Sequence, residues 1–418
     1  MSAAVLDEPL FNLRVLVCAG TGGVGKTTIA AALGLQAARR GRRTLVLTID
    51  PARRLADALG LETLNSTPTR VEFLGSEEAG ANSSGGRLDA MMLDPKPTFD
   101  GLINRLTPDE SARARIIENQ IYRHLSEALA GSAEYAAMEQ VHEAVESGQY
   151  DLVIVDTPPS NHALDFLRAP RRLREFLDSR FVKTLVRPAM SASRFGFRFF
   201  GRSLHRMIGL LDRIAGAGFL DDLTEFLSAI DGLSEGFQER ATRVESVLLG
   251  KDTGFVLVSS TTSGSDPGTF EFLTELDGLG ARLAAVVVNR VRPWPLAESA
   301  RSWRAGVSEA QLARDEETLR SAFSALPSPD LARTPAPEIA ARQAKDLIAA
   351  LRETAQACAN ADETLEILGA QAADRQIPCR AIPELADDVD RFEGLLEIGA
   401  HLAGAPPSTL REPAGNAP

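Results

Sequence analysis

The chain has 418 residues, of which 44% are hydrophobic and 24% are charged, and its formal net charge is −12. This composition excludes an intrinsically disordered chain, and the acidic balance argues against a nucleic-acid partner. The N-terminus lacks the features of a signal peptide, and no uncharged apolar run approaches the roughly 20 residues of a membrane-spanning helix. We therefore expect a soluble cytoplasmic protein.

Short apolar segments recur along the chain and predict buried strands. They lie at 13–18, 44–49, 88–93, 151–156, 254–259, 283–289 and 377–382. Because these segments are apolar throughout, both of their faces are expected to be covered, as in a parallel sheet between helices. The predicted fold is α/β, with a doubly wound, mainly parallel sheet of the P-loop NTPase type.

The predicted strands are regularly spaced except at two long intervals, and both intervals have helical periodicity. We interpret residues from about 94–150 and 161–250 as a helical subdomain inserted at the carboxyl edge of the sheet. The whole of 1–404 is then one domain, and 405–418 is expected to be a flexible tail. Within the second interval, residues 165–213 carry 12 Lys and Arg against 4 Asp and Glu.

A glycine-rich turn follows the first predicted strand. Its sequence, GTGGVGKT, matches G-x-x-x-x-G-K-[ST] and precedes a predicted helix, which is the context that a phosphate-binding loop requires. Lys26 is expected to act catalytically at the β- and γ-phosphates of a nucleotide, and the Thr27 hydroxyl to bind Mg²⁺. The predicted nucleotide-binding segment comprises Gly20, Thr21, Gly22, Gly23, Val24, Gly25, Lys26, Thr27 and Thr28.

Two acidic residues each end a predicted strand. Asp156 closes DLVIVD, where a P-loop protein needs a carboxylate for the water shell of its metal. Asp50 closes TLVLTID, where it is suited to orient the attacking water and to lie beside the metal. We therefore predict Thr27, Asp50 and Asp156 as the metal site and Asp50 as a catalytic residue; a strand-end cap is the alternative for Asp50.

Taken in order, several motifs resemble the arsenite-pump and tail-anchored-protein-targeting ATPases, which are deviant-Walker P-loop ATPases. The motifs are GTGGVGKTT, TIDPARRLADAL, MLDPKPTFDGLI, GSAEYAAMEQ, DTPPSNHALDFL, VVVNR and IPELADDV. Within this family, the chain resembles the bacterial branch of anion-transporting ATPases. The resemblance implies a dimeric ATP hydrolase that uses Mg²⁺; it assigns His162 to switch II, Asn289 to adenine recognition and Pro383 to the loop over the base.

The chain departs from this family at functional positions. Thr21 replaces a signature lysine that crosses the dimer interface, and Arg53 and Arg54 replace a histidine and an asparagine. One of the arginines could supply the missing charge in cis, or a paralogue could supply its lysine in trans; both arginines could also simply face solvent. The CxxC of eukaryotic members and a cysteine triad for arsenite are absent from the sequence.

Three biological functions are compatible with the sequence of this ATPase. The helical subdomain could handle hydrophobic or membrane-protein clients, with the basic, phenylalanine-containing segment 165–213 as a client groove, a membrane-surface contact or ordinary packed helices. The chain could instead be the ATPase subunit of an anion or metalloid efflux system. It could also be a weakly hydrolysing regulatory subunit. A homodimer and a heterodimer with a paralogous ATPase are both compatible with the sequence.

Overall fold

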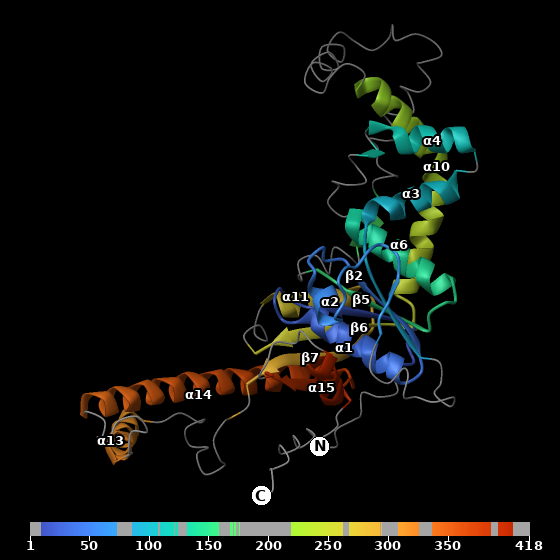
Figure 1. Ribbon diagram of the computed structural model, residues 1–418. Helices are drawn as coiled ribbons and strands as arrows, with labels where there is room; N and C mark the ends of the chain where they lie inside the picture. Colours follow the sequence, from blue (N-terminus) through green and yellow to red (C-terminus); the bar gives the residue numbers. More distant parts are fainter. Residues whose placement is uncertain are drawn as a thin grey trace, which may run out of the picture.

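A computed structural model describes residues 10–72, 86–107, 109–120, 122–123, 132–158, 168–169, 171–172, 175, 219–261, 267–292, 294, 308–325, 337–385 and 392–403 (Figure 1). Its centre is one eight-stranded sheet in the order β3-β4-β2-β5-β1-β6-β7-β8. The strands are β1 (Val15–Ala19), β2 (Arg43–Thr48), β3 (Thr69–Arg70), β4 (Arg87–Met92), β5 (Leu152–Asp156), β6 (Thr253–Ser260), β7 (Leu283–Val291) and β8 (Cys379–Pro383).

All neighbouring strands are parallel except β3, which runs antiparallel to β4. The mainly parallel α/β sheet predicted from the sequence is therefore confirmed, and each of the seven predicted apolar segments overlaps a strand. The sequence did not predict β3, because a two-residue strand is too short to have a recognisable hydrophobic pattern.

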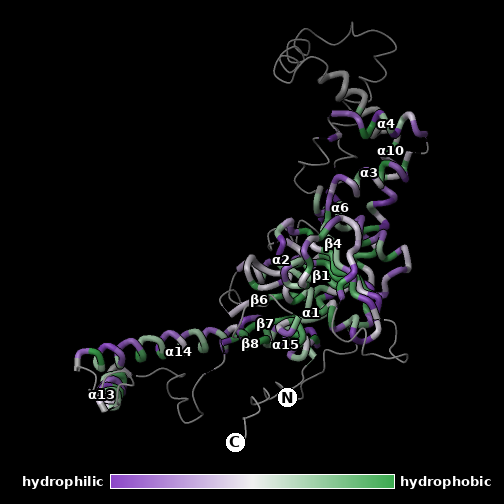
Figure 2. Tube along the Cα trace, viewed as in Figure 1, coloured by the Kyte–Doolittle hydropathy of each residue, from purple (hydrophilic) through white to green (hydrophobic). Residues whose placement is uncertain are grey.

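Helices cover both faces of the sheet. One face packs against α1 (Lys26–Arg39), α2 (Arg54–Ala58) and α15 (Phe392–Leu402), and the other packs against α3 (Pro95–Leu106), α6 (Ser132–Glu146), α10 (Phe219–Leu248), α11 (Pro267–Gly278) and α14 (Pro337–Asp374). Figure 2 shows the strands as the most hydrophobic part of the described chain. This is the double coverage that unalternating apolar strands require.

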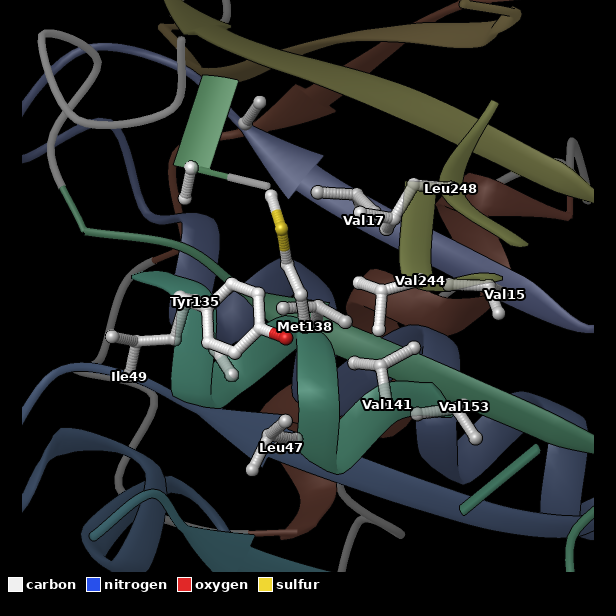
Figure 3. Close-up of a cluster of buried hydrophobic side chains, with 14 of the residues drawn as sticks. Val15, Val17, Leu47, Ile49, Tyr135, Met138, Val141, Val153, Val244 and Leu248 are labelled. Carbon is white, nitrogen blue, oxygen red and sulfur yellow. The ribbon is translucent and has the colours of Figure 1, made fainter. Parts of the chain in front are cut away.

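Successive residues of β1 show how the two faces differ. Val15 and Val17 belong to the cluster on the α6 and α10 side, whereas Leu16 and Cys18 belong to the cluster beneath α1. In Figure 3 the valines of β1 lie near Val141 of α6 together with Val244 and Leu248 of α10. All of these side chains are buried, so α6 and α10 are held on the sheet by apolar contacts.

The predicted helical insertion contains α3, α4 (Glu110–Glu118), α6 and α10 among the described residues. Asp94 and Asp109 cap the first two of these helices, because their carboxylates accept hydrogen bonds from backbone N–H groups of the first turn. The helices contact one another, and α4 and part of α10 lie beyond one end of the sheet (Figure 1). The basic segment 165–213 lies almost wholly outside the described residues, as do His162 and the predicted tail.

A third long interval separates β7 from β8, so the expectation of only two irregular intervals was wrong. It contains α13 (Glu309–Ala325) and the 38-residue α14, which pack against each other. Small residues of α14, including Ala340 and Ala344, are fully buried in this contact region. The first part of α14 extends away from the sheet in Figure 1, at the left of the view. Within the described residues, no helix has the length and apolarity needed to cross a membrane.

Candidate nucleotide site

The turn between β1 and α1 leaves several backbone N–H groups available for a ligand. Gly25 is the residue before α1 and has φ 95°, a left-handed conformation that glycine adopts without steric cost. It has no side chain to cap the helix, and the earliest α1 bond to it is from Ile29 N to Gly25 O at 3.0 Å. The N–H groups of the first turn, with the positive end of α1 behind them, can therefore bind an anion.

Lys26 is folded back over this turn. Its Nζ donates to the carbonyl oxygens of Gly20 and Thr21, at 3.1 and 2.9 Å, and the residue is only 7% exposed. Burial lowers the pKa of the Lys26 ammonium, and the positive charge of Arg54 acts in the same direction, whereas Asp156 and Asp50 oppose the shift. An ammonium held by two neutral carbonyls in this way is ready to exchange them for phosphate oxygens.

The end of β7 supports the outer side of the loop. Asn289, which is 6% exposed, donates from Nδ2 to the carbonyl of Val24 at 2.9 Å. A Cβ added to Gly25 would lie 2.3 Å from that same Nδ2, so only glycine leaves room for the contact. Arg290, with a left-handed φ of 56°, donates to the carbonyl of Gly23 at 3.2 Å. Adjacent side chains thus hold adjacent carbonyls of the loop.

Asp156 joins three elements at the carboxyl edge of the sheet. It is the last residue of β5, it is 1% exposed, and its strand neighbours in register are Cys18 of β1 and Thr48 of β2. Its Oδ2 accepts from the hydroxyls of Thr27 at 2.8 Å and Thr48 at 3.0 Å. Burial raises the pKa of Asp156 to about 6, although both hydrogen bonds and the charge of Lys26 oppose the shift.

Asp50 lies beside this cluster. Its backbone N–H donates to the Thr48 hydroxyl at 3.2 Å, and its Oδ1 accepts from Ala52 N at 3.0 Å. The other carboxylate oxygen, Oδ2, is 3.3 Å from a guanidinium nitrogen of Arg54. Arg53, in contrast, donates to the backbone carbonyl of Glu62. The two adjacent arginines therefore have different partners, and only Arg54 contacts the predicted catalytic acid.

The oxygen atoms around Asp156 fit a Mg²⁺ ion. Asp156 Oδ1 is buried and has no hydrogen-bond partner in the described parts of the chain, and the Thr27 hydroxyl lies next to the same carboxylate. Mg²⁺ prefers oxygen ligands and is usually held by one or two carboxylates together with substrate phosphates and water. In the part of the chain that the structure describes, no group of three His, Cys, Asp or Glu side chains could hold a metal alone. A site that is completed by a nucleotide is compatible with both observations.

The remaining predicted site residues lie around the same edge. Thr21 is 8% exposed, so its side chain faces into the protein, and its hydroxyl has no hydrogen-bond partner among the described residues. Thr28 is half-buried in the first turn of α1. Pro383 ends β8 opposite Val291 of β7, next to the strand that carries Asn289. Adenine recognition by Asn289 and base coverage by Pro383 stay predictions.

Sequence reasoning missed two residues of this arrangement, Thr48 and Arg290. Thr48 could have been suspected, because it is a polar residue at the carboxyl end of an apolar strand and lies two positions before Asp50. Arg290 gave no comparable signal, since its contact with Gly23 depends on the left-handed turn of its own backbone. Both residues position groups that the sequence did identify.

Comparisons with known proteins identify the family of the chain. The profile of the family described as anion-transporting ATPase matches residues 13–312, which include the phosphate loop, Asp50, Asp156 and Asn289. The match ends within α13, so most of the helical hairpin formed by α13 and α14, and all of β8, lie beyond it.

Individual relatives cover a similar part of the chain. An ATPase named GET3 from Malassezia globosa is 27% identical over 288 residues, which are 69% of this chain and 75% of the relative. An ATPase named get3 from Aspergillus terreus is 27% identical over 282 residues, 67% of this chain and 74% of the relative. An uncharacterised Streptomyces coelicolor protein, SCO2128, is 30% identical over 307 residues, 73% of this chain and 68% of the relative. The chain therefore belongs to the anion-transporting ATPase family and is an ATP hydrolase.

Proposed function

We propose that this ATPase uses Mg²⁺ and works as a dimer, in which the nucleotide state controls the helices around α3, α4, α6 and α10. These helices, with the segment 165–213, would handle hydrophobic or membrane-protein clients. The observation that carries the proposal is the carboxylate of Asp156, which is bonded at once to Thr27 of the nucleotide loop and Thr48 at the end of β2. A change of ligand at the nucleotide loop would therefore alter the contacts of Asp156 and, through them, the position of the end of β2.

Each residue at the site has a distinct task in hydrolysis. Lys26 and the N–H groups of the loop stabilise the charge that spreads over the transferred phosphoryl group. Thr27 and Asp156 would hold Mg²⁺, which supplies positive charge next to the phosphates when it is bound. Asp50 orients the attacking water. Asn289 and Arg290 keep the loop in its curved conformation through the Val24 and Gly23 carbonyls.

The same strand that ends in Asp156 connects the site with the helices. β5 follows α6 after a short turn, and α6 is tied to its neighbours by Glu139, which is 1% exposed. Glu139 Oε1 accepts from Arg240 of α10 at 2.7 Å and from Arg105 of α3 at 3.3 Å. Buried charge pairs of this kind fix the relative position of helices, so the three helices are expected to shift as a unit.

Client handling is tested by capture of a transmembrane-segment peptide. The full-length chain is incubated with a fluorescent peptide under ATP, ADP or nucleotide-free conditions, and binding is followed by anisotropy. The proposal expects affinity to differ at least several-fold between ATP and ADP. Lys26→Ala is the control, because it removes the phosphate contact and should abolish the difference. Equal affinity in all three states, or no binding in any of them, refutes the proposed output.

A second candidate function is that of an ATPase subunit in anion or metalloid efflux, favoured by the family description. Its prediction is that the ion stimulates ATP turnover. The cysteines do not favour a thiolate site for arsenite, since Cys18 and Cys358 are buried and Cys379 is half-buried. Turnover that is unchanged across added oxyanions and metalloids would exclude this candidate.

A third candidate, a weakly hydrolysing regulatory subunit, is favoured by Thr21. Its side chain carries no charge and is buried, so it cannot reach a partner's nucleotide. This candidate predicts slow turnover by the isolated chain and faster turnover after a paralogue with the complete loop is added. Molar mass by light scattering with and without ATP separates a homodimer from a chain that needs a second subunit.

A further inference from the structure

We infer that Arg54 is the cation that contacts the γ-phosphate of ATP, in place of the lysine missing at position 21. In the nucleotide-free chain Arg54 is held by Asp50, and it leaves this acid for the phosphate when ATP binds. The inference rests on the proposed function, because it assumes that the triphosphate lies in the loop before α1.

The geometry selects Arg54 over its neighbour. The guanidinium of Arg54 is 3.3 Å from Asp50 Oδ2, the oxygen left free when Oδ1 accepts from Ala52 N. Arg53 instead donates to the backbone carbonyl of Glu62, which lies in the loop between α2 and β3. The Asp50 backbone is bonded to Thr48, and Thr48 to Asp156, so the acid that holds Arg54 belongs to the phosphate site.

The electrostatic arrangement favours an exchange of partners. The side chain of Arg54 is 66% exposed and that of Asp50 is 23% exposed, so their attraction is screened by water and contributes little to stability. A γ-phosphate carries more negative charge than one carboxylate and accepts two parallel hydrogen bonds from a guanidinium.

The exchange has a consequence for the reaction. Water forms the new bond to the γ-phosphorus, and the bond to the β–γ bridging oxygen breaks with its electron pair remaining on ADP. One proton of the water stays on the phosphate and the other passes to solvent. Arg54 would neutralise charge on the γ-oxygens in this step, while Asp50, freed of its ion pair, becomes available to orient the water. One movement thus supplies the cation and releases the acid.

The test compares Arg54→Ala with Arg53→Ala in the full-length chain. Affinity for ATP and for ADP is measured by calorimetry, and turnover by phosphate release. Arg54→Ala is expected to weaken ATP binding roughly tenfold and to leave ADP binding unchanged, because ADP lacks the γ-phosphate. Arg53→Ala should preserve the preference for ATP, and Arg54→Lys should restore part of it. Binding is informative even if the isolated chain hydrolyses slowly.

Three outcomes overturn the assignment. They are an unchanged preference for ATP in Arg54→Ala, an equal loss of ATP and ADP affinity, and a loss in Arg53→Ala instead. In each case the proposed nucleotide site is retained if the wild-type chain binds ATP and the Lys26→Ala variant does not. A correctly folded wild-type chain that binds neither nucleotide overturns the proposed function itself. Circular dichroism of each variant establishes that the fold is retained.

Discussion

Replacing Asp156 with asparagine should change how the stability of the nucleotide-free chain depends on pH. The carboxyl is 1% exposed, and burial raises its pKa from 3.8 to about 6. Between these two values the unfolded chain has lost the proton while the folded chain still holds it. The free energy of unfolding therefore falls as the pH rises through this window.

The size of the effect follows from the shift in the pKa of Asp156. A shift of about two units corresponds to about 3 kcal/mol, at about 1.4 kcal/mol per unit. At about pH 4.5 the unfolded carboxyl is mostly ionised, so part of this contribution to the free energy of unfolding is already lost. The contribution should fall by about another 2 kcal/mol between about pH 4.5 and about pH 8. The asparagine variant has no titration at this position.

The assay is urea unfolding of both proteins across this pH range, with a chelator present and no nucleotide. The quantity of interest is the wild-type free energy of unfolding minus that of Asp156→Asn, because other titrating groups cancel in the difference. We expect it to decline by about 2 kcal/mol from low to high pH. A difference that stays constant across the range, or that increases, would show that the Asp156 carboxyl is not destabilised by burial, and the reasoning would fail.

Three further predictions concern the loop and the helices. Gly25→Ala places a Cβ 2.3 Å from Asn289 Nδ2 at a residue with φ 95°, and it should reduce ATP affinity, measured by calorimetry, at least about tenfold. The control is Gly280→Ala, where φ is 68° and, apart from its chain neighbours, no atom of the described residues lies within 4 Å of the added Cβ. This variant should cost about 1 kcal/mol of stability and leave ATP affinity unchanged. Asn289→Ala leaves the Val24 carbonyl without its partner, so ATP and ADP affinity should fall together; a loss confined to ATP would contradict this. Glu139→Ala leaves Arg240 without its closest carboxylate, although Glu146 remains at 3.3 Å, and should destabilise the chain by about 1.5–3 kcal/mol in urea unfolding. A change below about 1 kcal/mol would show that the buried pair does not hold α6 and α10 together.

The strands and the phosphate loop were predictable because their signals are local. An apolar segment such as 151–156 is buried on both faces, and six residues are enough to show its pattern. The phosphate-loop motif GTGGVGKT is likewise contained within eight consecutive residues. Thr27 and Asp156 are 129 residues apart, and their proximity was predicted only because the phosphate-loop motif requires a carboxylate at the end of a neighbouring strand. The contact of Asn289 with Val24, between residues 265 positions apart, was not predictable, since no motif links the two.

The hairpin between β7 and β8 was missed for a different reason. The buried stripe of α14 consists mainly of small side chains, among them Ala340, Ala344, Ala355, Cys358 and Ala361, and most other positions in its first half are exposed. A stripe of alanines is hard to recognise in a sequence, because alanine is also common on the exposed faces of helices. The choice between Arg53 and Arg54 was not predictable either, because both arginines lie at the start of the same short helix and their partners depend on the fold.

Because α14 is long, a small tilt of the end that packs on the sheet would produce a large displacement of its other end. A helix of 38 residues is about 57 Å long. Its C-terminal part is anchored on the sheet by Leu368 and Ala372, and it leads into the strand that ends at Pro383. A tilt of only about 5° at that anchor would sweep the free end through about 5 Å, since displacement grows with the length of a rigid rod. Probes attached near Ile339 could therefore report adjustments at the loop that are too small to measure there.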